Sequence, residues 1–297
     1  MDFLTAFLNS LPGAVGQGLI WGIMAMGVYI TFRILDVADL TVDGSLATGG
    51  AVAALAISLG WTPWAALLAA VLAGILTQLA LYSINLRIMA IGDAATTKAT
   101  LAVSVDKYDL LVSARYIRDV ALNTPLVLMT LFTVAVIALL YWFFGTEMGA
   151  SLRATGSNSN MARAQGINTD RSKVLGLVVS NGMVAMAGGL LAQYQGSSTI
   201  DMGRGAIVIG LAAVIIGEVL LGKVFRNFAL KLLSAVIGAI IYYVVITLVL
   251  RLGLESTDLK LLTALVVAVF LAIPYWKGKY IPAKVKTGAQ NGGNRNA

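Results

Sequence analysis

Long uninterrupted stretches of apolar residues constrain this chain more than any other feature of its sequence. A helix that crosses the hydrocarbon core of a bilayer needs about 20 such residues. The backbone can satisfy its polar groups in lipid only internally, so stretches of this length become helices. The clear apolar runs cover residues 13–34, 62–84, 125–144, 174–194, 229–250 and 259–276.

Two further apolar runs are shorter and richer in small residues. Residues 45–59 and 205–221 could each form a full span or a broken, re-entrant segment. With them, the sequence predicts an all-α, polytopic transmembrane bundle of roughly eight membrane segments. We expect residues 1–286 to form a single transmembrane domain. The Gly- and Asn-rich residues 287–297 are expected to be a disordered cytoplasmic tail.

The composition excludes several classes of protein. Only 12% of the residues are charged and 59% are hydrophobic, whereas a soluble domain is typically about a quarter charged. The chain has no Cys and no His, which removes disulfides, thiolate metal sites and His-based catalysis. We therefore expect no metal site and no cofactor in this chain.

The basic residues predict the orientation in the membrane. The tail after Trp276 is basic and contains no acid, and the loop of residues 145–173 has an excess of Arg and Lys. Basic loops stay in the cytoplasm, so this loop and the C-terminus are predicted to be cytoplasmic. The net charge of +7 is assigned to such loops at the lipid surface, since no nucleic-acid-binding motif accompanies it.

Within this loop, whose bounds we set at residues 146–173, residues 152–166 have the pattern of a short helix. Residues 161–165 have helix-favouring side chains, and Gly156 and Gly166 bracket them as start and stop signals. The pattern predicts a helix that lies along the membrane surface. A partner protein could grip such a helix, or the loop could be a basic membrane anchor.

Several blocks of the sequence occur in the order and spacing of a known family. They cover residues 149–166, 176–182, 187–196, 207–212, 214–218 and 258–262. Together they resemble the ABC-importer permeases for branched-chain amino acids, ribose and related solutes. The similarity is closest to a subgroup associated with uptake of tryptophan, tyrosine or other small solutes. Residues 61–79 differ, because they fuse two apolar segments that the subgroup keeps apart.

The resemblance implies a set of partners. A second permease copy, a cytoplasmic ATPase dimer and an extracytoplasmic solute-binding protein would complete the importer. This chain lacks a Gly-x-x-x-x-Gly-Lys-Ser/Thr phosphate loop, so ATP and Mg would bind to the partner ATPase. The solute would be an amino acid, with aromatic ones included, or a similar small molecule.

The resemblance also assigns the loop to ATPase coupling. In this assignment, small side chains such as those of Ala162 and Ala164 pack into a cleft of the ATPase. The residues expected at this contact are Arg153, Ala154, Thr155, Gly156, Asn158, Ala162, Ala164 and Gly166.

Polar residues within the apolar runs are candidates for the translocation pathway. Ionisable groups at membrane depth are costly and therefore suggest function, although Glu218 could simply reach the cytoplasmic interface near Lys223. Polar amides and hydroxyls could instead form hydrogen bonds between helices. The candidates are Asn181, Gln193, Tyr194, Gln195 and Glu218.

Two further features concern surfaces and packing. Asp36, Asp39 and Asp43 follow the first apolar run. They could dock the binding protein at the outer mouth, or lie in a solvated loop where a helix dipole favours acids. The small-residue pairs Gly18/Gly22 and Gly188/Ala192 predict close helix packing.

Two rival functions stay open at this point. An ion-coupled secondary transporter would carry several intramembrane acids, and Glu218 is the single candidate in the sequence. A non-transport membrane scaffold or enzyme is the other rival. With no His and no Cys, the sequence offers little catalytic equipment for it.

Overall fold

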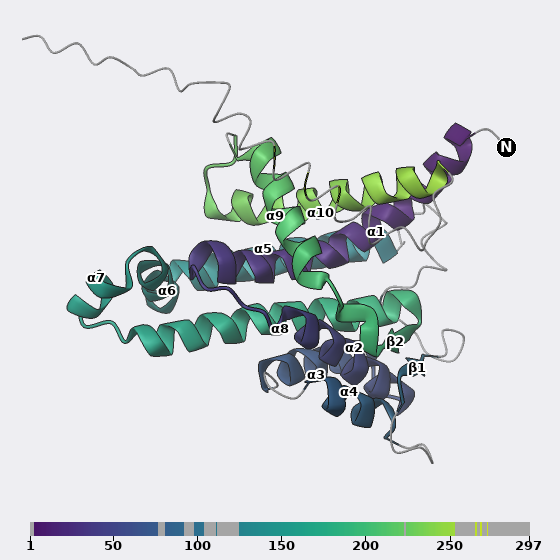
Figure 1. Cartoon of the computed structure of the whole chain (residues 1–297), viewed down its shortest axis with the longest axis horizontal. Coiled ribbons are helices and arrows are strands. Elements are labelled where there is room, and N and C mark those ends of the chain that lie inside the picture. The colour runs from purple at the N-terminus through teal and green to yellow at the C-terminus, as the bar shows by residue number, and fades with distance from the viewer. Residues whose placement is uncertain are drawn as a thin grey trace, which may run out of the picture.

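The computed structural model describes residues 3–76, 81–91, 98–103, 111, 125–222 and 224–252, with the isolated residues 265, 268 and 272. Within these ranges the chain is a bundle in which α1, α5, α8 and α10 lie along one common direction (Figure 1). The helices are α1 (Phe3–Tyr29), the π-helical turn η1 (Ile30–Ile34), α2 (Val42–Ser58), α3 (Pro63–Leu76), α4 (Leu81–Met89), α5 (Pro125–Gly145), α6 (Glu147–Ser157), α7 (Ser159–Ala164), α8 (Thr169–Gln195), the 3-10 turn η2 (Ile200–Gly203), α9 (Ala206–Leu221) and α10 (Phe228–Arg251).

Five described segments are long and apolar enough to cross a membrane, which confirms a polytopic helical bundle. They are Thr5–Ile34, Leu126–Gly145, Thr169–Gln195, Ile200–Leu221 and Phe228–Arg251. The shorter run at 205–221 reaches this length together with η2, from which Arg204, with extended backbone angles, and Gly205, at φ 83°, separate α9. The predicted run 259–276, apart from three isolated residues, and the tail 287–297 lie outside the described residues.

The predicted run 62–84 holds two described helices. They are α3, which begins at Pro63, and α4, and the residues between them lie outside the described part. Both helices contact α2. The 14 residues of α3 are fewer than a full span requires. Sequence hydrophobicity alone could not separate the two helices, because the apolar run is unbroken.

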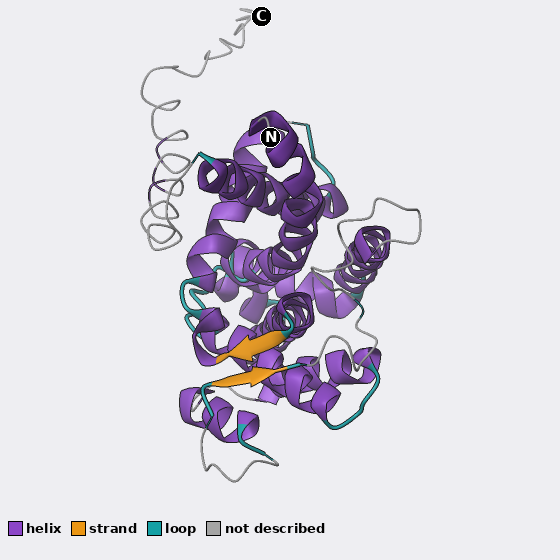
Figure 2. Cartoon of the chain, turned by 90° about the vertical axis from the view of Figure 1, so that its right-hand side faces the viewer, coloured by secondary structure: helices purple, strands orange, loops and turns teal. Residues whose placement is uncertain are grey.

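A small β-pair departs from the all-α prediction. Strand β1 (Thr100–Ala102) pairs antiparallel with β2 (Ser197–Thr199), with Leu101 opposite Ser198, and Figure 2 shows the two strands in orange. Gly196, at φ 70°, ends α8 and turns the chain into β2. Strands of three residues are too short to produce a recognisable alternation, so the fold is mostly rather than purely helical.

Small residues allow the central helices to approach closely, as predicted. A Cβ at Gly18 would lie 2.6 Å from Cα of Ile240, and one at Gly22 would lie 2.9 Å from Cγ1 of Val236. Gly188 of α8 abuts the backbone carbonyl of Leu46 in α2 in the same way. The small-residue faces therefore serve packing of α1 on α10 and of α8 on α2.

The chain between η1 and α2 is non-helical and enters the bundle. Figure 1 shows it running from the end of α1 that lies near α6 to the start of α2, beside the middle of α8. Asp36, at its start, lies near Gly156 and Ser157 of α6, whereas Asp39 is buried against α8. Irregular backbone at membrane depth is tolerated where protein surrounds it. Helix α2 therefore begins inside the bundle.

Candidate functional site

The loop between α5 and α8 forms two short helices at one end of the bundle (Figure 1). Three side chains cap the helices in turn. Thr146 accepts a hydrogen bond from Gly149 N at 3.4 Å, Asn158 from Met161 N at 3.0 Å, and Asn168 from Arg171 N at 3.1 Å. Ser, Thr and Asn at such positions satisfy the free N–H groups of a first turn. The predicted helix is thus present as α7, and Gly166 at φ 81° follows its end.

The start signal in this loop was predicted wrongly. Gly156 lies within α6 and does not begin the next helix. It abuts the carbonyl oxygen of Ile34, so any Cβ there would collide with it. Asn158, with extended backbone angles, is the residue that begins α7. The signal was present in the sequence, since Asn is a favoured N-cap residue.

The outward face of α7 also differs from the prediction. Ala162 is only 3% exposed and is buried within this chain, so it is not free to pack into a partner's cleft. Met161, which is not among the residues expected at the ATPase contact, is 63% exposed. The other expected coupling residues divide between exposed Arg153, Asn158, Ala164 and Gly166, half-buried Ala154 and Gly156, and buried Thr155.

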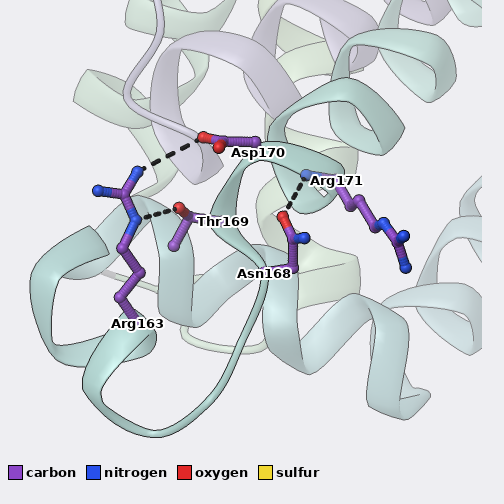
Figure 3. Close-up of polar contacts among 5 residues, drawn as sticks. All are labelled: Arg163, Asn168, Thr169, Asp170 and Arg171. Atoms are coloured by element: carbon purple, nitrogen blue, oxygen red, sulfur yellow. Dashed lines mark hydrogen bonds and ion pairs between the residues drawn. The ribbon is translucent and has the colours of Figure 1, made fainter.

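Arg163 ties α7 to the start of α8 (Figure 3). Its Nε donates a hydrogen bond of 3.0 Å to Oγ1 of the buried Thr169, and its guanidinium lies 3.5 Å from the carboxylate of Asp170. Exposed ion pairs contribute little, and both charged side chains here are mostly exposed. The bond to Thr169 therefore fixes α7 relative to α8 more firmly than the ion pair does.

A second group of polar residues lies buried at the start of α2. The Asn181 amide donates to Asp39 Oδ2 at 2.9 Å, and the Ser45 hydroxyl donates to Asn181 Oδ1 at 2.6 Å. Thr41 donates to Asp39 Oδ1 through its hydroxyl at 2.6 Å and its N–H at 2.9 Å. Each buried polar group thus has a partner, as stability in a low-dielectric interior requires. Hereafter the polar cluster means Asp39, Thr41, Ser45 and Asn181.

The three acids do not form the common exposed surface that docking was expected to use. Asp39 is 5% exposed and belongs to the polar cluster. Asp43 accepts hydrogen bonds from the N–H groups of Gly205 and Ile207 at 3.0 and 2.9 Å, which caps α9. Asp36 is exposed but lies beside α6. Their spacing could not reveal this, because it depends on the chain entering the bundle.

The remaining pathway candidates lie at separate levels of the bundle. Glu218 of α9 forms an ion pair with Arg33 of η1 near the end that carries α6. The other three lie at the opposite end of α8. Gln193 is buried there and accepts a hydrogen bond of 3.1 Å from Leu111 N. Tyr194 donates a hydrogen bond of 3.2 Å to Gly13 O, and Gln195 is exposed. The structure joins Asn181 to Asp39 but does not bring these candidates into one site.

Comparison with known proteins decides the family. Residues 11–273 match the model of a family described as "Branched-chain amino acid transport system / permease component". The chain belongs to this permease family. The permease is 36% identical over 287 residues to the tyrosine transport system permease protein of Clostridioides difficile (strain R20291), covering 89% of this chain and 91% of that one.

Two other relatives say less about function, because one is uncharacterised and the other aligns with less than half of this permease. An uncharacterised protein of Rickettsia prowazekii (strain Madrid E) is 31% identical over 290 residues, covering 89% of this chain and 98% of its own. The xylose transport system permease protein XylH of Escherichia coli (strain K12) is 31% identical over 118 residues, which cover 40% of this chain and 28% of that one. No solved structure matches the permease. The resemblance seen in the sequence is confirmed, and the chain is a membrane-embedded permease component of a transport system.

Proposed function

We propose that this permease forms the solute pathway of an importer driven by a separate cytoplasmic ABC ATPase dimer. ATP and Mg bind to that partner, two permease copies form the membrane unit, and an extracytoplasmic solute-binding protein delivers the solute. The chain crosses the bacterial inner membrane roughly eight times, with its α6–α7 loop and C-terminus in the cytoplasm. The basic residues of the loop support this orientation.

The solute proposed is an aromatic amino acid. The relative named for tyrosine aligns with nearly the whole chain, whereas the relative named for xylose aligns with 40% of it. Uptake of labelled tyrosine and tryptophan into vesicles that contain the complete importer tests this proposal. Uptake that follows an ion gradient and ignores ATP would instead support a secondary transporter.

The observation that carries the proposal is the exposed tip of α7. Met161 presents an unbranched apolar side chain to solvent, beside exposed Asn160 and Ala164. Arg163, two residues after Met161, connects the same helix to α8. A rigid element with an exposed apolar side chain suits a partner that transmits movement to the bundle, and Met adapts well to such surfaces.

A pair of methionines provides a matched test of this contact. Met161→Glu places a charge at the proposed contact, where burying it without a partner is costly, so co-purification of the ATPase should be lost. Met148→Glu makes the same change on α6, where Met148 is 57% exposed, and should leave the complex intact. Loss with both variants, or with neither, would refute α7 as the ATPase contact.

A further inference from the structure

An open groove of about 900 Å³ lies at the α6 end of the bundle. Its walls come from the ends of η1 and α5, from α6, and from the start of α10. It is separate from the exposed tip of α7 and from the polar cluster, neither of which contributes to its lining. Two of the residues expected at the ATPase contact, Arg153 and Gly156, line the groove, and none of the pathway candidates does.

The charged residues of this groove are all basic. Arg33, Arg153, Arg226 and Lys231 line it, and none of the described lining residues is acidic. Arg33 is paired with Glu218. Arg153, Arg226 and Lys231 form no ion pair within the described part of the chain. Three cations, Arg153 of α6, Arg226 just before α10 and Lys231 of α10, thus line a common space with no neutralising partner among the described residues.

The start of α10 adds to this positive potential. Asn227, its N-cap residue, lines the groove and forms no side-chain cap hydrogen bond. The first N–H groups of a helix carry partial positive charge, and they attract anions. Together with the three cations, the groove is suited to a group that carries negative charge and several acceptor oxygens, such as a phosphate.

The other side of the groove is formed by aromatic side chains. Tyr141 and Trp142, on the last turns of α5, line it and are largely exposed. Tyr and Trp gather where the bilayer meets water, which places the groove at headgroup level. Phe144 and Phe228 lie deeper, with ring centroids 4.9 Å apart. A small soluble anion has no apolar part that could pack against these aromatic side chains.

We propose that the groove binds the headgroup phosphate of an anionic phospholipid, with the acyl chains lying along the lipid-facing side of α5. Basic pockets between membrane helices on the cytoplasmic side are suited to such headgroups. The proposal rests on the cytoplasmic orientation given above. The lipid would connect α6 to α10, because Arg153 belongs to one and Lys231 to the other.

The test measures binding of fluorescent phosphatidylglycerol to the purified full-length permease, and does not require ATPase or transport. The double variant Arg226→Gln/Lys231→Gln should bind it roughly 30-fold more weakly, since each basic residue near an anionic headgroup contributes about fivefold. The control Arg171→Gln/Lys173→Gln removes the same charge at the same end, from residues outside this groove, and should bind normally. A failed importer reconstitution would leave this result unaffected.

Three results would overturn the proposal. Equal loss in the control would mean that net charge, and not the groove, attracts the lipid. Displacement by inorganic phosphate as effective as by unlabelled phosphatidylglycerol would make it a site for a soluble anion. Unchanged binding in Arg226→Gln/Lys231→Gln would mean that these cations do not hold the lipid.

A second measurement leaves the basic residues unchanged. The chain has no Cys, so Ser157→Cys in the groove and Asn160→Cys on α7 each provide a single thiol. In phosphatidylcholine nanodiscs, adding phosphatidylglycerol should slow labelling by an uncharged maleimide several-fold at position 157 and not at position 160. Equal rates at position 157 with and without the anionic lipid would contradict the proposal.

Discussion

The side-chain amide of Asn181 donates a hydrogen bond of 2.9 Å to the carboxylate of Asp39. This bond joins the middle of α8 to the non-helical segment that leads into α2. Asp39 has no basic partner among the described residues, so its charge is balanced by hydrogen bonds from Asn181 and Thr41. The polar cluster therefore determines where α2 can begin.

Asn181→Leu is expected to destabilise the permease. It leaves the carboxylate of Asp39 and the hydroxyl of Ser45 without their shared buried partner, at a cost of about 1–3 kcal/mol. Thermal unfolding of the purified protein in detergent would measure this. Asp36→Asn is the control, because Asp36 is exposed at φ 53°, where Asn is well tolerated. Equal midpoints for the two variants would show that the cluster does not stabilise the fold.

Asp43→Ala should lower stability by about 1 kcal/mol, the usual cost of losing a helix cap. The variant removes both acceptors at the start of α9. The comparison is Asp201→Ala, which removes an exposed ion pair with Arg204 and should change the unfolding midpoint little. A larger effect at position 201 than at position 43 would contradict this account of α9.

Gly156→Ala should destabilise the contact between α6 and η1. Its Cβ would collide with the carbonyl oxygen of Ile34, and forced shifts of this kind cost about 1–3 kcal/mol. Gly145→Ala is the matched change, because a Cβ there meets nothing within 4 Å. Urea or thermal unfolding should separate the two variants. Identical stability would mean that the backbone relaxes without cost.

Thr169→Val should impair coupling and leave ATPase binding intact. The variant removes the acceptor for Arg163 Nε, which fixes α7 to α8, but it does not alter the exposed face of α7. ATPase stimulation by the loaded binding protein in proteoliposomes is the readout. Asp170→Asn removes the exposed ion pair and should have a small effect. Full stimulation in Thr169→Val would show that this bond transmits no movement.

The long helices could be predicted from the sequence, because hydrophobicity over about 20 residues determines them. Helices α5, α8 and α10 each lie within a few residues of the predicted run. Gly18 and Gly22 were also predicted correctly, since small residues at this spacing favour close packing. These features depend on residues that are near one another in the sequence.

The site could be predicted only in part, because its geometry depends on distant residues. The burial of Asp39 requires residues 36–41 to enter the bundle and reach Asn181, and no local pattern indicates that path. Ala162 and Met161 are neighbours with opposite exposure, and the direction in which α7 faces depends on its packing. The strands β1 and β2 pair residues about 100 positions apart.

The attachment of α8 at two levels has a mechanical consequence. At one end of α8, Thr169 accepts the hydrogen bond from Arg163. Twelve residues further, about 18 Å along the helix axis, Asn181 is hydrogen-bonded to the segment that leads into α2. If a partner tilts α8 at Thr169, the movement reaches α2 through Asn181, near the middle of α8. We therefore expect the largest displacement of α2 at its buried beginning. A constriction of the pathway that moves with α2 would therefore lie near the middle of the membrane, level with the centre of α8.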